Sequence, residues 1–362
     1  MGKSKLWTVF GAQWGSEGKG EICALITKNE RVDLAVRIGG PNAGHSSILE
    51  DGTKVVVRSI PTPVMFGVDG VIGPEGMIHP DVLEAELRRA YQILGRPAKL
   101  YVDGCTSVVG EKHIESERNS GLTARIGSTS EGVGACTVDK VMRIPSAVVK
   151  DFDVMQGLIE RFNGPEFNVV WGANTVQLCN DALLGGQNLL IEGTQGYGLS
   201  LNTGGYYPFC TSRECTPQAL WAGTGINPKN ASVSEVVAVC RTYPIRVGGN
   251  SGPMEGEMTW EQLKEVSHGY VKVPEKTTVT QRERRIAWWN NELFHRAILQ
   301  TCPDVLAITF LDYRFPELAG LGAEELEANQ AAKRWLDGIA FLGRLPVKYA
   351  STGPGKSFYL YH

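Results

Sequence analysis

Short runs of apolar residues, many of them β-branched, recur along the whole chain between segments with helical periodicity. The first run covers residues 6–10, and the others cover 34–38, 54–60, 100–103, 189–192, 233–239, 305–311 and 346–351. Apolar runs of this length that alternate with helices are typical of an α/β fold. The pattern predicts a mostly parallel central sheet flanked by helices. We expect a single domain over residues 1–362, because no repeat or linker interrupts the chain.

Helical periodicity is clearest in two segments. Residues 80–94 begin with a proline, which suits a first helical turn, carry an apolar face and are followed by Gly95. Residues 324–336 form the second predicted helix. Residues 126–136 and 194–211 are long glycine-rich connections, and they predict ligand-binding loops because they exceed what packing requires.

Composition limits the choice of partners. With 42% hydrophobic residues the chain can bury a large core, and 36 lysines and arginines against 39 acidic residues give a net charge of -3. This balance disfavours a nucleic-acid-binding module, which would need a basic face. The eight cysteines include no C-x-x-C pair and predict buried reduced thiols, and the chain has no run of about 18 apolar residues. We therefore expect a cytoplasmic protein without a nucleic-acid or membrane partner.

A glycine-rich turn follows the first apolar run, with the sequence GAQWGSEGKG at residues 11–20. Such a turn between a strand and a helix binds phosphate, because its backbone N–H groups and the helix dipole favour an anion and Lys19 adds a full charge. A standard P-loop has a serine or threonine after the lysine, whereas Gly20 has no hydroxyl for magnesium. A GTP-binding switch is disfavoured by this difference and by Phe310, which stands where its NKxD motif would have a lysine.

Five further motifs occur along the chain: GGPNAGH at 39–45, EGTQG at 192–196, YPFCTS at 207–212, TQRERRIAW at 280–288 and STGP at 351–354. With the glycine-rich turn they resemble, in the same order, the motifs of the adenylosuccinate synthetase family, from residue 6 to residue 356. The resemblance implies that family's fold, which is like that of P-loop NTPases, and its activity as a C–N ligase. Such an enzyme joins L-aspartate to a purine monophosphate with a nucleoside triphosphate and Mg²⁺. Phosphorylation of the purine O6 comes first, because oxide is a poor leaving group.

The resemblance also implies roles for individual residues. Ser16 and His45 occupy the catalytic positions, and we expect His45 to titrate near neutrality. Magnesium would be ligated by Ser16 and the Gly44 carbonyl, and the triphosphate would bind Gly15, Glu17, Gly18, Lys19, Gly20, Asp312, Ser351, Gly353 and Pro354. The purine monophosphate would bind Ser16, Asn42, Thr129, Gln195, Thr211 and, from the neighbouring subunit of a homodimer, Arg143. The aspartate substrate would bind Thr280, Arg282 and Arg284, because guanidinium groups pair with carboxylates.

Position 16 departs from the family, which has an aspartate there that removes the purine N1 proton and ligates magnesium. A hydroxyl is no such base near neutral pH, but the other motifs keep their chemistry, so Ser16 points to a different purine. Guanine carries an amino group at C2, next to N1, and serine offers both space and an acceptor oxygen for it. In this the chain resembles the phage 2-aminoadenylosuccinate synthetases of the family, which act on dGMP. We predict dGMP as the substrate; the alternative is an ordinary adenylosuccinate synthetase that uses IMP and GTP.

Other departures concern the phosphoryl donor and the substrate loops. Residues 309–312 read TFLD where the family has TKLD, so Phe310 could stack on any base and we expect ATP or dATP as donor, with GTP as the alternative. A purely structural role for Phe310 in a strand stays open, as does the acceptor of the N1 proton, for which Glu17 is a neighbouring candidate. Lys356 and Glu131 stand where the family often has arginine, and the sequence does not explain the negative charge of Glu131.

Overall fold

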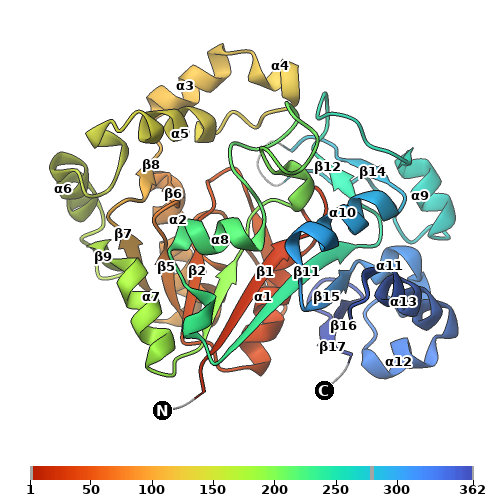
Figure 1. The fold of residues 1–362 in the computed structure, drawn as a ribbon. Helices are drawn as coiled ribbons and strands as arrows, with labels where there is room; N and C mark the ends of the chain where they lie inside the picture. The colour runs from red at the N-terminus through yellow and green to blue at the C-terminus, as the bar shows by residue number, and fades with distance from the viewer. Residues whose placement is uncertain (1–2, 278–280, 361–362) are drawn as a thin grey trace.

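A computed structural model describes residues 3–277 and 281–360. In this part of the chain ten strands form the main sheet: β1 Lys5–Gly11, β2 Leu34–Arg37, β5 Asp69–Ile72, β7 Lys99–Asp103, β9 Asn168–Ala173, β10 Leu189–Glu192, β11 Val233–Arg241, β15 Val305–Thr309, β16 Val347–Ser351 and β17 Ser357–Tyr359. Their spatial order is β17-β16-β15-β11-β1-β10-β2-β5-β7-β9 (Figure 1). Neighbouring strands pair in parallel, apart from the antiparallel pair of β16 and β17. The predicted mostly parallel sheet is confirmed.

Strand β1 lies at the centre of the sheet and joins two apolar cores. Its side chains point alternately to opposite faces, so that Leu6 packs in one cluster of buried side chains and Trp7 in another. Helix α8 (Pro217–Thr224) contributes to the first cluster and helix α1 (Lys19–Asn29) to the second. Figure 1 shows α8 in front of the sheet and α1 behind it. The turn between β1 and α1 is therefore anchored at both ends by buried elements.

The remaining elements cover the faces and the rim of the sheet. The other α-helices are α2 Pro80–Leu94, α3 Glu111–Asn119, α4 Leu122–Ile126, α5 Val133–Val141, α6 Phe152–Arg161, α7 Thr175–Leu184, α9 Trp260–Val266, α10 Asn291–Thr301, α11 Leu311–Arg314, α12 Ala323–Ala328 and α13 Gln330–Gly343. Small sheets pair β3 His45–Ile48 with β4 Lys54–Val57, β6 Met77–Ile78 with β8 Ser107–Val108, and β14 Arg285–Ala287 with β12 Ile245–Arg246 and β13 Glu257–Met258. Short 3-10 turns span Thr62–Phe66, Pro145–Ala147, Tyr197–Leu199, Pro228–Asn230 and Pro316–Leu318. Among the described residues, no helix is long and apolar enough to cross a membrane.

Most predicted strands are present, with two corrections. The run at residues 54–60 is a strand only as far as Val57, and it pairs with β3 outside the main sheet. The run at 305–311 ends at Thr309, because Phe310 takes a left-handed backbone conformation (φ 56°) and α11 begins after it. Strands β5, β9 and β17 lay outside the predicted runs; β9, at the sheet edge, alternates half-buried and exposed residues instead of forming an apolar run.

The predicted helix at residues 80–94 is confirmed as α2, and Gly95 ends it with a φ of 66°. The single helix predicted at 324–336 is wrong. Asn329 interrupts it, because its side chain accepts the backbone N–H groups of Ala331 and Ala332 and so starts α13 after α12 has ended. The predicted loop at 126–136 is wrong at its end, where α5 begins at Val133.

The cysteines are free thiols, as predicted, but not all are buried. Cys105 and Cys210 are half-buried and Cys302 is exposed, whereas Cys23, Cys136, Cys179, Cys215 and Cys240 are buried. The long connection at 194–211 contains one 3-10 turn and otherwise runs as an irregular loop from β10. It lies at the carboxyl edge of the sheet with the loops that follow β1, β2, β11 and β15. In parallel sheets this edge is where ligands bind.

Candidate functional site

The turn between β1 and α1 is folded around one buried carboxylate. Gly15, Ser16 and Gly18 have φ angles of 94°, 57° and 87°, which bend the chain tightly. Glu17 points under the turn, where it accepts the Gly15 N–H at 2.7 Å and pairs with the Lys19 ammonium at 2.6 Å. Because this carboxylate is fully buried, it cannot accept a proton from a purine in the cavity above. The side chain of Glu17 therefore cannot contact a triphosphate in the cavity, and only its backbone N–H could fulfil the predicted role in triphosphate binding.

Glycines at three positions are required by close approach around the turn. A Cβ atom at Gly11 or at Gly196 would lie 2.4 Å from the carboxylate of Glu17. A Cβ atom at Gly20 would lie 2.9 Å from the Ser46 carbonyl, where α1 packs against β3. A serine or threonine of the standard P-loop would therefore collide with β3 at position 20. The structure explains why this phosphate loop has glycine after its lysine.

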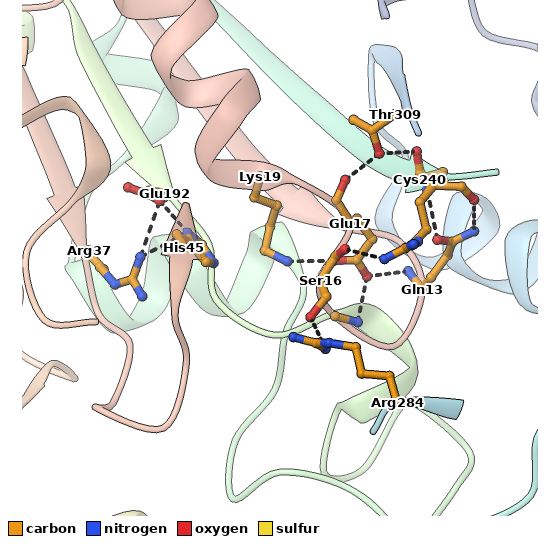
Figure 2. A network of polar contacts seen from close by, with 12 residues as sticks. Gln13, Ser16, Glu17, Lys19, Arg37, His45, Glu192, Cys240, Arg284 and Thr309 are labelled. Carbon is orange, nitrogen blue, oxygen red and sulfur yellow. Dashed lines mark hydrogen bonds and ion pairs between the residues drawn. The ribbon is translucent and has the colours of Figure 1, made fainter. Parts of the chain in front are cut away.

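Helix α1 begins at Lys19, directly after the turn. The first N–H groups of a helix have no acceptor within it, so they and the helix dipole favour an anion. The turn is fixed to the sheet by Thr309 at the end of β15, whose hydroxyl donates to the Glu17 carbonyl at 2.6 Å. Figure 2 shows this contact together with the Lys19–Glu17 pair. The arrangement can hold the phosphates of a nucleotide.

Two buried charges from adjacent strands hold His45. Arg37 ends β2 and Glu192 ends β10, the two residues are paired in register, and both are fully buried. The Nδ1 atom of His45 contacts the Glu192 carboxylate and lies 3.0 Å from Nη1 of Arg37 (Figure 2). The N–H and hydroxyl of Thr62 also donate to Glu192, at 2.6 and 2.7 Å. The imidazole is therefore fixed before any ligand binds.

These charges set the proton on His45. Burial and the neighbouring Arg37 lower the pKa of His45 to about 4, so the near-neutral titration expected from the sequence is wrong for the ligand-free site. Burial by itself would raise the pKa of Glu192, but His45 and Arg37 lower it to about 2. An ionised Glu192 can only accept, which assigns the proton to Nδ1 of His45 and leaves Nε2 as an acceptor for the cavity.

A cavity joins the turn to the loops after β2 and β10. The predicted site residues that line it are Gly15, Ser16, Lys19, Asn42, Gly44, His45, Thr129, Gln195 and Arg284. It is also lined by residues that the sequence did not indicate: Trp14, Ala43, Leu199, Val247 and Thr277. None of the described residues that line it is an aspartate or glutamate. Trp14 stands inside the glycine-rich motif, so its position in the motif was a usable signal, whereas Val247 and Thr277 carry no such signal.

Ser16 is exposed at the cavity and is held by two arginines. Its hydroxyl accepts from Nη1 of Arg284 at 2.6 Å, and its carbonyl accepts from Arg241 at 3.3 Å. Arg241 is fully buried and also pairs with Glu275 at 2.5 Å. Arg284, predicted to bind aspartate, therefore lies within hydrogen-bond distance of the residue predicted to face the purine, as Figure 2 shows.

Comparison with known proteins decides the family. The family model described as adenylosuccinate synthetase matches residues 8–165 and 166–318. The chain belongs to the adenylosuccinate synthetase family. The enzyme is thus a ligase of the adenylosuccinate synthetase type, which forms a C–N bond. An adenylosuccinate synthetase of Methanococcus aeolicus is 34% identical over 351 residues, which cover 96% of each chain.

Two solved structures have the same fold. The succinoaminodeoxyadenylate synthetase of cyanophage S-2L, bound to dGMP and to dATP as an energy donor, is 28% identical, with a TM-score of 0.78 and coverage of 99% of this chain and 96% of that chain. The fully ligated adenylosuccinate synthetase of Plasmodium falciparum is 21% identical, with a TM-score of 0.78 and coverage of 98% and 99%. The α/β fold expected from the resemblance is confirmed.

The adenylosuccinate synthetase family uses a magnesium ion, and the predicted ligands fit it unequally. Magnesium takes oxygen ligands and often keeps several waters beside one or two carboxylates and the phosphates of the substrate. The Gly44 carbonyl at the cavity can serve in such a set. The hydroxyl of Ser16 faces the guanidinium of Arg284, which disfavours a cation there. A magnesium ion at this site would depend mainly on phosphate oxygens and water.

The residues predicted to bind the donor base lie together, outside the cavity. Asp312 is buried, and its Oδ2 accepts from the Tyr270 hydroxyl at 2.9 Å. Burial raises the pKa of Asp312. A Cβ atom at Gly353 would lie 3.9 Å from the same carboxylate, so the closing STGP motif meets the TFLD motif here. Phe310 is half-buried beyond the end of β15, and the guanidinium of Arg241 lies 3.8 Å from its ring centre, so one face of the ring is not free for a base.

The other predicted site residues lie away from the cavity or outside the described residues. Thr280 lies outside them. Arg282 is exposed, and Thr211 is half-buried and bonds through its N–H to the carbonyl of Leu199, which lines the cavity. Arg143 is exposed two residues after the end of α5, with a φ of 61°. A role for Arg143 in this chain's own cavity is not supported by its position.

Proposed function

We propose that this adenylosuccinate synthetase condenses L-aspartate with dGMP, with ATP or dATP as the phosphoryl donor. The products are N6-succino-2-amino-2'-deoxyadenylate, which is the precursor of the diaminopurine nucleotide for DNA, a nucleoside diphosphate and phosphate. The donor first transfers its terminal phosphoryl group to O6 of guanine, and the N1 proton passes to water. The aspartate amine then attacks C6, and the C6–O bond breaks to release phosphate. The observation that carries the proposal is Ser16 at the cavity in place of an acidic residue.

The geometry of Ser16 supports a guanine substrate. A carboxylate at this position would pair with Arg284 and could accept the N1 proton of hypoxanthine. It would also fill the space that the C2 amino group of guanine needs. A serine is smaller, and its hydroxyl accepts from Arg284 with one lone pair and keeps a second for the C2 amino group of guanine. The cyanophage relative, solved with dGMP and dATP, gives independent support. The curated relatives of about the same length are ordinary adenylosuccinate synthetases, which keeps IMP as the second candidate.

The roles of the polar groups follow from their positions. Lys19 and the start of α1 would hold the triphosphate, and Nε2 of His45 would meet the phosphoryl group on O6. An anion at Nε2 raises the pKa of an imidazole, so the phosphoryl group would recruit a proton to His45 during the reaction. Asn42, Thr129 and Gln195, which also line the cavity, would bind the purine monophosphate. Magnesium, when bound, would neutralise charge on the phosphates.

A steady-state comparison of dGMP, GMP and IMP tests the proposal. We expect kcat/KM for dGMP to exceed that for IMP by about 100-fold, because a site built for a hydrogen bond rejects the purine that lacks the group. The variant Ser16→Asp should reverse the order towards IMP. Ser232, which lies in the loop before β11, provides a matched control as Ser232→Asp. A wild-type preference for IMP contradicts the dGMP proposal.

A homodimer completes the proposed site. The apolar side chains of Val138, Val141 and Met142 are 60 to 69% exposed beside Arg143. Exposed apolar side chains grouped in this way are typical of an interface. A second copy of the chain seated there would bring Arg143 to the phosphate of the partner's purine nucleotide. If sites are shared, each hybrid dimer of Arg143→Ala with Lys19→Met has one intact site of two, so an equal mixture should regain up to about a quarter of wild-type activity. No recovery contradicts this assembly.

A further inference from the structure

Glu131 puts a negative charge beside a cavity for anionic substrates, and the structure contains its partner. The guanidinium of Arg58 contacts the Glu131 carboxylate through Nη2. Through Nε the same guanidinium donates to the Pro41 carbonyl. Arg58 therefore bridges two loops, residues 39–44 after β2 and residues 127–132 before α5. The negative charge of Glu131 is therefore neutralised by Arg58 within the protein and does not repel the anionic substrates.

Each of these two loops presents one polar side chain to the cavity. Asn42 follows Pro41 in the first loop, and Thr129 lies two residues before Glu131 in the second. The carbonyl on the far side of Asn42, that of Ala43, is held by Arg37 at 2.8 Å. Asn42 thus stands between two peptide carbonyls that are each fixed by an arginine. The distance between the two loops decides whether Asn42 and Thr129 can bind one ligand together.

Arg58 is itself firmly placed. It follows β4, and its N–H donates to the Glu86 carboxylate, which also accepts the N–H groups of Ser59 and Ile60 at 3.0 Å. Glu86 belongs to α2 and is buried. On the other side, the loop that carries Glu131 is held where the Gly132 N–H donates to Glu117 at 2.9 Å. The ion pair therefore connects two segments whose backbones are each held by a buried carboxylate, so it can fix the distance between the loops at residues 39–44 and 127–132.

We propose that Arg58 and Glu131 form a positioning pair that sets the spacing of Asn42 and Thr129 around the purine monophosphate. The inference rests on the proposed placement of that nucleotide between these two side chains. Neither residue touches the reacting atoms, so loss of the pair weakens nucleotide binding and leaves the chemical step nearly unchanged.

Steady-state kinetics and calorimetry on the full-length enzyme test the pair. Glu131→Gln should raise the KM of the purine nucleotide about 10-fold, and Arg58→Met about 30-fold because it also releases Pro41, while kcat changes less than about threefold. The double variant should be no worse than Arg58→Met, since both changes break the same bridge. The KM values of aspartate and of the triphosphate should not change. Unchanged nucleotide KM in Glu131→Gln, or equal rises for all three substrates, would overturn the proposal.

Two controls separate positioning from stability and from substrate choice. Glu166→Gln breaks a comparable ion pair with Arg88, remote from the cavity, and should leave every KM unchanged. Glu131→Gln should shift the melting temperature by no more than about 2 °C, because the pair is partly exposed. If Arg58→Met does not fold, Glu131→Gln alone decides. Binding is measured with dGMP, GMP and IMP; a preference for IMP contradicts the proposed substrate, and the pair is then judged on its effect on IMP.

Glu131→Arg reverses the charge at position 131 and tests the positioning role more severely than removal of the charge does. It would place two guanidinium groups together and push the loops apart, so nucleotide KM should rise more than in Glu131→Gln. Tighter nucleotide binding in Glu131→Arg would show that position 131 acts on the substrate directly, and it would overturn the positioning role.

Discussion

The phosphate side and the aspartate side of the cavity are built differently. On the phosphate side, Lys19 and Glu17 pair with 2% and 0% exposure, and His45 sits against the buried Arg37 and Glu192. On the aspartate side, Arg284 is half-buried and contacts a neutral hydroxyl, and Arg282 is exposed. The phosphate side holds its charges in place without a ligand. The aspartate side keeps guanidinium groups that can exchange their contacts for a carboxylate.

This difference separates two tasks of the same site. Phosphoryl transfer needs groups that are preorganised before the transition state, and buried ion pairs supply this at a large desolvation penalty. Substrate selection needs groups whose interactions with the ligand are stronger than those with their partners in the ligand-free protein. The position that departs from the family, Ser16, lies where the two sides meet, because Arg241 holds its carbonyl and Arg284 its hydroxyl.

The largest expected effect comes from Lys19→Met. It removes the cation of the phosphate loop, so kcat/KM should fall about 1,000-fold. It also leaves the buried carboxylate of Glu17 without a compensating cation, and the free energy of unfolding should fall by about 3 kcal/mol or more. Urea denaturation and kinetics measure the two effects. The double variant Glu17→Gln/Lys19→Met should regain most of the stability and none of the activity; recovered activity would contradict the role of Lys19.

Glu192→Gln should lower kcat about 100-fold by releasing His45 from its orientation. At pH 7 it should lower the free energy of unfolding by about 3 kcal/mol, because the pKa of Glu192 falls from near 4.5 to about 2 on folding. A lowered carboxyl pKa stabilises the folded protein above pH 4.5, and this stabilisation is lost as the pH falls towards 2. Urea denaturation from pH 7 to pH 3 should therefore show the difference from wild type shrinking below pH 4.5. A constant difference would contradict the assignment.

Arg284→Gln should raise the KM of aspartate about 30-fold and leave the free energy of unfolding within about 0.5 kcal/mol, since among the described residues its half-buried guanidinium contacts only neutral groups, the Ser16 hydroxyl and the Lys276 carbonyl. Arg282→Gln provides the matched comparison. It should raise the same KM less, because Arg282 does not line the cavity. A larger effect of Arg282→Gln would show that the segment moves on binding aspartate.

The smallest effect is expected for Tyr270→Phe, at the donor end. Guanine offers two N–H donors to a carboxylate, whereas Tyr270 already occupies Oδ2 of Asp312. Removing the hydroxyl should raise the use of GTP relative to ATP about threefold. Donor competition assays measure the ratio. An unchanged ratio in Tyr270→Phe, together with a changed ratio in Asp312→Asn, would confine donor choice to Asp312.

Much of the fold was predictable from local pattern. Apolar runs such as 189–192 and the capped helix at 80–94 are determined by short-range sequence. Predictions failed where a single residue or a remote partner decided the structure. Asn329 split a periodic segment by capping its second half, and Phe310 ended an apolar run by adopting a left-handed backbone. The strand at 54–57 was expected in the main sheet, but pairing with His45–Ile48 placed it elsewhere.

The motifs by themselves determined the family, the phosphate loop and the residues that meet at the cavity, because each motif keeps its residue types in a short segment. The sequence also singled out Ser16 as the position that departs from the family. Only the tertiary structure decided which charges face the substrates. Glu17 lies under its own loop, Glu131 is paired with Arg58, and the pKa of His45 is lowered by Arg37. Arg58 and Glu131 are 73 residues apart, and even for Lys19 and Glu17, two residues apart, only the folded backbone decides which groups meet and are buried. Burial then strengthens these interactions by removing water.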